Sequence, residues 1–172
     1  MQTSGTLAFV LPSRNLNDAE KHVAYRQARS AIDATLAGES DRMTKMVTIN
    51  CLLKSFLPYY YWTGFYILKA GRLTVGPYQG TLGCLHIDVG RGVCGRAAQT
   101  QTTQIVADVH QLAQGCEHIA CDPNSSSEIV VPVSDRDGKL IAVFDVDSTL
   151  TRSFDVIDQH YLEDLLHSYF SV

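Results

Sequence analysis

Two pairs of strand-like segments are each joined by a short turn sequence, and this feature restricts the fold of the chain more than any other. Residues 62–68 and 73–78 are rich in aromatic and β-branched side chains and flank an Ala-Gly dipeptide. Residues 128–133 and 140–147 flank the turn sequence Ser-Asp-Arg-Asp-Gly. Such short turns join neighbouring strands that run in opposite directions. The sequence therefore predicts two β-hairpins.

Helical periodicity lies on both sides of these hairpins. Residues 15–36, 40–57 and 154–169 carry apolar side chains at helical spacing. Ser40 and Ser153 stand in the N-cap positions of the second and third of these segments. Helices first, hairpin-linked strands next and a helix last predict an α+β fold with a mostly antiparallel central sheet flanked by helices.

The length of 172 residues fits one compact domain. Residues 1–14 have no periodic pattern and are expected to form a loose arm, whereas residues 15–172 are expected to form a single domain. The apolar stretch 7–12 lacks the length and basic flank of a signal peptide, and no later stretch is long enough to span a bilayer. We expect a soluble, cytoplasmic protein.

The net charge of -4 comes without a cluster of lysine and arginine. A basic patch is the electrostatic signature of proteins that bind nucleic acid or anionic membranes. The sequence therefore argues against both kinds of partner.

Five cysteines in a reducing compartment argue against a permanent disulfide framework. Cys51 follows Val47 by one helical turn, on the apolar stripe of the second helix, and is expected in the core. A zinc site is the other common explanation for cysteines and histidines, but few of them have the close spacing of ligand pairs in structural zinc sites. We expect no bound metal. The ligands considered for zinc are Cys84, Cys94, Cys116, Cys121, His86, His110 and His118.

The glycine pattern at residues 90–95 is similar to a dinucleotide-binding turn. That turn requires a βαβ unit and an acidic residue about 20 positions further on, and Asp108 comes too early. The glycines instead allow the backbone to approach a ligand closely, and N–H groups at a helix start could hold a carboxylate. Cys94 lies in this turn, where a helix N-terminus would lower its thiol pKa.

Cys121 lies in a polar loop directly before a predicted strand. Loops of this kind often carry function. The alternative is that Cys94 and Cys121 are incidental surface thiols, and the residues alone leave both interpretations open.

Acidic side chains end one face of the last predicted strand. Val143, Asp145 and Asp147 share this face because side chains alternate along a strand. A four-residue loop would pair Ser134 with Lys139 and place Glu128 directly opposite Asp145. Like charges at that distance raise one pKa and keep a proton available.

Trp62 and Tyr66 share a face of the first predicted strand. An aromatic wall, an acidic group and nearby thiols would suit a small zwitterion that carries a polarizable sulfur group.

The order of several motifs identifies a family resemblance. The chain resembles the free methionine-R-sulfoxide reductases, which are stand-alone GAF-domain enzymes, over residues 59–150. The matching motifs are Trp-Thr-Gly-Phe-Tyr at 62–66, Gly-Pro-Tyr-Gln-Gly at 76–80, Gly-Arg-Gly-Val-Cys-Gly at 90–95, Val-Ala-Asp-Val-His at 106–110, His-Ile-Ala-Cys-Asp at 118–122, Ser-Glu-Ile-Val-Val-Pro-Val at 127–133 and Asp-Val-Asp-Ser at 145–148.

The resemblance implies a GAF fold and three functional cysteines. Cys121 would attack the sulfoxide, and either Cys84 or Cys94 would resolve the product. Trp62 and Tyr66 would surround the methyl and sulfur groups, while the acidic residues would contact the sulfoxide and the amino group. The acidic residues are Glu128, Asp145 and Asp147. The link at residues 112–117 is longer than the family pattern and adds Cys116.

The expected reaction reduces free methionine-R-sulfoxide through a cysteine sulfenic acid and an intramolecular disulfide, which a thioredoxin-like dithiol reduces. It requires no metal, flavin or nicotinamide cofactor. The N-terminal residues 1–40 would provide helical cover or contacts in a homodimer. The alternative is a non-enzymatic GAF module that binds a small ligand or senses redox state, but such a module has no need for thiols in two separate pocket loops.

Overall fold

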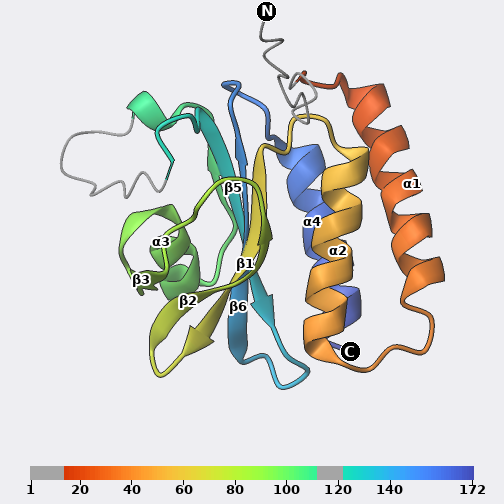
Figure 1. Cartoon of the computed structure of the whole chain (residues 1–172), viewed down its shortest axis with the longest axis vertical. Helices are drawn as coiled ribbons and strands as arrows, with labels where there is room; N and C mark the ends of the chain where they lie inside the picture. The colour runs from red at the N-terminus through yellow and green to blue at the C-terminus, as the bar shows by residue number, and fades with distance from the viewer. Residues whose placement is uncertain (1–13, 112–121) are drawn as a thin grey trace, which may run out of the picture.

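The computed structural model describes residues 14–111 and 122–172, which form an antiparallel sheet with helices on both faces (Figure 1). The helices are α1 (Asp18–Thr35), α2 (Arg42–Phe56), α3 (Gly92–Thr100), the 3-10 turn η1 (Val109–Gln111) and α4 (Val156–Phe170). The strands are β1 (Trp62–Lys69), β2 (Arg72–Gln79), β3 (His86–Asp88), β4 (Gln104–Val106), β5 (Ser127–Ser134) and β6 (Leu140–Ser148). Their order in the sheet is β3-β2-β1-β6-β5-β4. The predicted α+β fold is confirmed.

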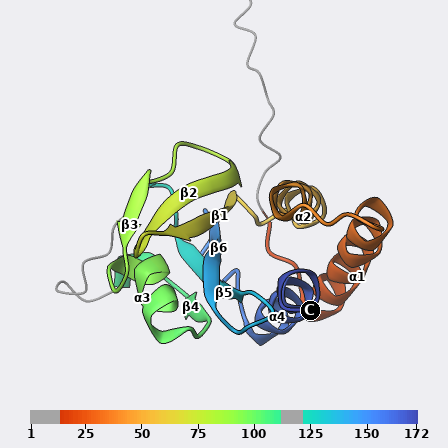
Figure 2. The ribbon, with the colours of Figure 1, turned by 90° about the horizontal axis from the view of Figure 1, so that it is seen from below.

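The sheet separates two hydrophobic cores, as Figures 1 and 2 show. Helices α2 and α4 cover one face, where Phe65 and Phe144 are fully buried, and α1 packs on the outside of these two helices. Helix α3 covers the other face, to which Trp62, Tyr66 and Val143 belong. The alternation of side chains along β1 and β6 assigns neighbouring residues to opposite cores.

The β1–β2 hairpin was correctly predicted. Ala70 has φ 48° and Gly71 has φ 80°, and two successive positive φ values are typical of the tight turns that match the twist of a hairpin. This turn brings Thr63 opposite Gln79.

The β5–β6 hairpin has a different register from the predicted one. Glu128 lies opposite Asp147, so the predicted pairing of Glu128 with Asp145 is wrong, as is the pairing of Ser134 with Lys139. The observed partner of Glu128 lies two residues further along β6 than the predicted one. Because side chains alternate between faces, a shift of two residues leaves Glu128 on the same face as both aspartates.

Hydrogen bonds inside the loop explain this offset. The carboxylate of Asp135 accepts the backbone N–H of Asp137 at 3.1 Å and that of Lys139 at 3.0 Å. These bonds hold Lys139 in the turn, and the register shifts between Val133 and Ser134. The wider loop therefore shifts the pairing between β5 and β6 residues relative to the predicted pairing.

Two helices begin at aspartates and not at the predicted serines. Asp41, not Ser40, caps α2, and Asp155, not Ser153, caps α4. A carboxylate is a strong acceptor for the free N–H groups of a first helical turn. None of the helices in the described ranges is long and apolar enough to cross a membrane.

The predicted burial of Cys51 is wrong. Helix α2 buries Met46, Ile49 and Leu53, whereas Val47 is 49% exposed and Cys51 is also exposed. Cys51 does share a stripe with Val47, but this stripe faces away from the sheet.

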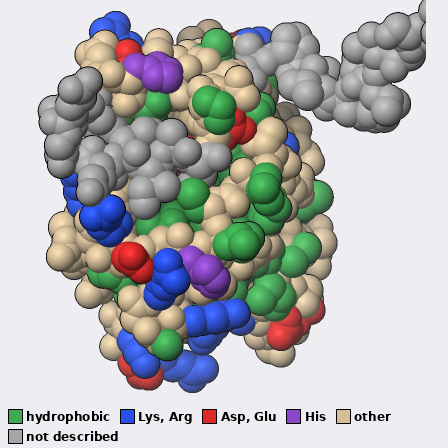
Figure 3. Space-filling view, turned by 60° about the vertical axis from the view of Figure 1, so that its left-hand side comes forward, with side chains coloured by type: hydrophobic (Ala, Val, Ile, Leu, Met, Phe, Trp, Pro, Cys, Tyr) green, Lys and Arg blue, Asp and Glu red, His purple; other side chains and the backbone are tan. Residues whose placement is uncertain are grey.

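Basic and acidic side chains lie close together on part of the α3 side of the molecule. In the view of Figure 3, basic side chains gather near the lower end of this face with acidic side chains beside them. One such pair joins Arg72 Nε on β2 to Asp88 Oδ1 on β3 at 2.8 Å.

Candidate active site

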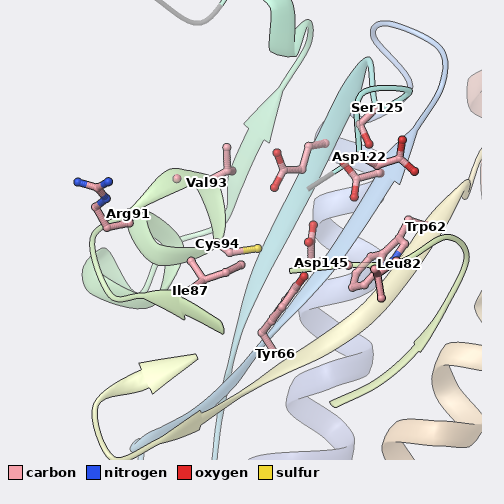
Figure 4. A pocket seen from close by; sticks show the side chains of 14 residues that line it. Trp62, Tyr66, Leu82, Ile87, Arg91, Val93, Cys94, Asp122, Ser125 and Asp145 are labelled. Atoms are coloured by element: carbon pink, nitrogen blue, oxygen red, sulfur yellow. The ribbon is translucent and has the colours of Figure 1, made fainter. Parts of the chain in front are cut away.

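A pocket between the sheet and α3 brings together most of the predicted site residues (Figure 4). The predicted residues that line it are Trp62, Tyr66, Cys94, Glu128, Asp145 and Asp147. They come from β1, α3, β5 and β6, and the sheet register places those on the strands on the face that α3 covers.

The acidic group lies at the centre of the pocket. Trp62 and Glu128 flank Asp147 from β1 and β5, respectively, and Gly64 lies beside Asp145. Glu128 and Asp145 are each only 6% exposed. A Cβ on Gly64 would lie 2.4 Å from Tyr78 Cβ and 2.7 Å from the Trp62 ring, so the glycine lets these aromatic side chains pack closely against β1.

Burial and mutual repulsion make these carboxyl groups weak acids. Burial, followed by repulsion from Asp147, raises the pKa of Asp145 well above its usual range. The pKa of Glu128 is also raised, by burial and then by both aspartates. Burial raises the pKa of Asp147 to about 7. The group can therefore hold protons near neutral pH and still attract a cation.

Asp145 has unused hydrogen-bonding capacity. Its Oδ1 atom is buried and has no hydrogen-bond partner among the described residues. A buried carboxylate oxygen without a partner is unfavourable. A donor group on a bound molecule would satisfy it.

Cys94 faces the acidic group from α3. Its sulfur, a carboxylate oxygen of Glu128 and one of Asp145 lie within 4.8 Å of one another. Burial, then Asp145 and Glu128, raise the pKa of the Cys94 thiol. The expectation that the helix N-terminus lowers this pKa is wrong, because burial and two carboxyl groups outweigh the helix dipole.

Aromatic rings form the opposite wall of the pocket. The Trp62 ring lies parallel to those of Tyr66 and Tyr78, with centroids 5.7 Å and 5.4 Å away. The indole N–H donates to the carbonyl of Thr81 at 3.0 Å. Gly83 also lines the pocket, and a Cβ there would meet Trp62 at 2.9 Å. The indole is thus held by stacking, by a hydrogen bond and by close glycine contacts.

The glycine pattern before α3 has a structural explanation. Gly90 has φ +87°, and its N–H donates to the carbonyl of Gly95 at 2.8 Å. A Cβ on Gly95 would lie 2.4 Å from the carbonyl oxygen of Asp88. The preceding strand, β3, is antiparallel to β2, so this turn does not belong to a βαβ unit.

The cysteines differ in oxidation state. Cys84 is half-buried and disulfide-bonded, whereas Cys51 and Cys94 are free thiols. The predicted nucleophile Cys121 and the extra Cys116 lie outside the described residues, as does His118.

Sequence reasoning assigned no role to several other residues of the pocket wall. They include Leu82, Gly83, Ile87, Arg91, Asp122 and Ser125. Asp122 ends the motif at 118–122 that supported the family resemblance, but nothing in the sequence indicated its contacts. Its carboxylate accepts a hydrogen bond from the hydroxyl of Thr81.

Comparison with known proteins places this geometry in context. Residues 62–169 match the family model described as GAF domain. The free methionine-R-sulfoxide reductase of Escherichia coli is 38% identical over 142 residues, which cover 83% of this chain and 84% of the relative.

Two solved structures are similar across most of the chain. The free methionine-R-sulfoxide reductase from Neisseria meningitidis in complex with its substrate has a TM-score of 0.79 and 35% identity, and the match covers 90% of each chain. The reduced form of fRMsr of Staphylococcus aureus has a TM-score of 0.78 and 40% identity, with 85% of this chain and 92% of that chain covered.

Proposed function

This chain belongs to the GAF domain family and, within it, to the free methionine-R-sulfoxide reductases, and we propose that Cys121 performs its chemistry at the pocket under α3. The enzyme reduces free methionine-R-sulfoxide to methionine. The arrangement that best supports the site assignment is the acidic group facing Trp62 and Cys94, in which Glu128 and Asp145 are buried and Asp147 is half-buried.

The pocket chemistry matches the parts of a free amino acid. Asp145 and Asp147 would bind the ammonium group, which would also satisfy the unpartnered Oδ1 atom of Asp145. Gly92 and Val93, in the first turn of α3, line the pocket and could bind the carboxylate through their N–H groups. A peptide lacks both charges at an internal methionine, so this binding mode favours the free amino acid.

The first step transfers oxygen from the substrate to the enzyme. The Cys121 thiolate attacks the sulfoxide sulfur while Glu128 donates a proton to the sulfoxide oxygen. The hydroxyl group then passes from the substrate sulfur to the Cys121 sulfur as the new sulfur–sulfur bond breaks. The substrate sulfur thereby gains two electrons and leaves as the thioether of methionine, and the Cys121 sulfur loses two electrons and becomes a sulfenic acid. The raised pKa of Glu128 supports its role as the proton donor.

The second step forms a disulfide. A resolving thiol attacks the sulfenic acid, a sulfur–sulfur bond forms, and the oxygen leaves as water. Cys84 is the better candidate because it is disulfide-bonded, whereas Cys94 is a free, buried thiol with a raised pKa. A weakly acidic thiol supplies little thiolate for such an attack.

A thioredoxin-like dithiol would complete the cycle by thiol–disulfide exchange. Leu82 is 74% exposed and Leu85 is 62% exposed, so apolar surface flanks Cys84 in the sequence and is open to a protein reductant. Dependence on such a reductant is consistent with a cytoplasmic location.

The competing proposal is a non-enzymatic GAF module. A binding module would retain the aromatic wall and the acidic group, but it would not require oxidation of Cys84.

A single-turnover assay separates these proposals. Reduced protein would be mixed with an excess of either epimer of free methionine sulfoxide, without reductant. The amount of methionine formed per protein molecule would then be measured. We expect about one equivalent from the R epimer and none from the S epimer or from a blocked peptide. Binding of the R epimer without any methionine would favour the non-enzymatic module.

A further inference from the structure

Asp122 joins three segments of the chain at the edge of the pocket. Its carboxylate accepts hydrogen bonds from Thr81 Oγ1 and from Tyr61 OH, the latter at 3.1 Å. It also accepts the backbone and side-chain N–H groups of Asn124 at 2.8 Å and 2.9 Å. Tyr61 directly precedes β1, and Thr81 lies between β2 and Cys84. The loop at residues 80–84 is therefore tied to the segment after Cys121.

The same loop holds the aromatic wall. The carbonyl of Thr81 accepts the indole N–H of Trp62 at 3.0 Å. A Cβ on Gly80 would lie 2.8 Å from Trp62, and a Cβ on Gly83 would lie 2.9 Å from it. The backbone of the loop therefore packs directly against the indole, and a shift of Thr81 must move the ring or break its hydrogen bond.

The charge of Asp122 strengthens these contacts. Burial alone would raise its pKa, but hydrogen bonds from Thr81, Asn124 and Tyr61 lower the pKa below the usual range. Asp122 thus remains ionised while the neighbouring Asp147 has a pKa of about 7. Hydrogen bonds to an ionised acceptor are stronger than those between neutral groups.

We propose that Asp122 is a positioning residue that fixes the loop at residues 80–84, and through it both the resolving sulfur of Cys84 and the indole wall of Trp62. The role of Cys84 rests on the function proposed above, whereas the effect on Trp62 does not. Asp122 can act on both because Thr81 links them: its hydroxyl donates to Asp122, and its carbonyl accepts the indole N–H of Trp62.

The variants Asp122→Ala and Thr81→Val test this role from both sides of the hydrogen bond. The matched control is Asp41→Ala, because the carboxylate of Asp41 also accepts a backbone N–H, that of Thr44 at 2.7 Å, but does so at the start of α2 on the opposite side of the sheet. Asp122→Asn is the milder variant to use if the alanine variant does not fold.

Trp62 is the chain's single tryptophan, so tryptophan fluorescence reports on the wall without contribution from other tryptophans. We expect Asp122→Ala and Thr81→Val to red-shift its emission and to increase quenching by acrylamide. The KM for the sulfoxide should rise. Combining the two substitutions should add little to either one, because they remove the same contact.

The second measurement is the rate at which the disulfide forms after one turnover, followed by a sulfenic acid trap. Misplacement of a reacting group by about 1 Å can slow a reaction by about 100-fold. We therefore expect disulfide formation to slow on the order of 10- to 100-fold in both variants and to be unchanged in Asp41→Ala.

The proposal is overturned if folded Asp122→Ala matches the wild type in Trp62 emission, quenching and rate of disulfide formation. It is also overturned if the Asp41→Ala control shows the same changes, since the effect would then be general loss of stability. Failure of the wild type to form methionine would contradict the proposed function instead, and Trp62 fluorescence would still test the contact between Asp122 and the wall.

Discussion

Glu128 on β5 lies directly opposite Asp147 on β6, and both side chains line the pocket under α3. Asp145 completes the group from the same strand as Asp147, and Cys94 approaches it from the helix. Three carboxyl groups this close cannot ionise independently. The apparent pKa values therefore describe the three carboxyl groups together. Substitutions within this group should change the pH dependence of both catalysis and stability.

Replacing Glu128 by Gln should slow formation of methionine in the first turnover by about 10² to 10⁴, the usual contribution of general acid catalysis. In the wild type, the rate of this step should fall as pH rises through the raised pKa of the acidic group, because the proton donor is then lost. Rapid-quench measurements over a range of pH would test this. Glu163→Gln, on the exposed side of α4, is the control. An unchanged first-turnover rate at every pH would remove Glu128 from the mechanism.

Replacing Asp147 by Asn should flatten the dependence of stability on pH. The pKa of an unfolded aspartate is about 3.9, and that of folded Asp147 is about 7. The folded state then binds more protons than the unfolded state between these values, so the free energy of unfolding falls as pH rises from about 4 to about 7. Urea titrations across this window should show a smaller decline for Asp147→Asn. An equal decline in both proteins would contradict the raised pKa.

The fold could be predicted where local patterns act alone. The Ala-Gly turn and the alternation in β1 and β2 identified a hairpin, and helical periodicity located α1, α2 and α4. The register of β5 and β6 could not be predicted, because side-chain bonds from Asp135 set the loop length. The position of Cys51 was missed because α2 has apolar side chains on its exposed face as well.

The pocket wall could be predicted from strand alternation, which grouped Trp62 with Tyr66 and Asp145 with Asp147. The environment of Cys94 could not, because its thiol meets the acidic group only after α3 packs on the sheet. Asp122 was missed for a similar reason, since Tyr61 and Thr81, two of its hydrogen-bond partners, lie far from it in the sequence.

Replacing Cys51 by Ala should leave both activity and stability nearly unchanged. Its side chain is exposed on α2, and surface substitutions usually change the free energy of unfolding by no more than about 0.5 kcal/mol. Urea denaturation and steady-state turnover with a dithiol reductant would check this. Loss of turnover in a folded Cys51→Ala protein would mean that this thiol takes part in the redox cycle.

The oxidation states of Cys84 and Cys94 predict different defects when each is replaced by serine. Cys84→Ser should form about one equivalent of methionine and then stop, because the sulfenic acid at Cys121 has no resolving thiol. Cys94→Ser should continue to cycle with a thioredoxin-like reductant, with an altered KM because Cys94 lines the pocket. Methionine counting combined with mass spectrometry of trapped sulfenic acid would distinguish the two, and Cys51→Ser provides a control that cycles normally. The assignment would be reversed if Cys94→Ser stopped after one equivalent while Cys84→Ser continued, since the buried thiol would then be the one that closes the disulfide.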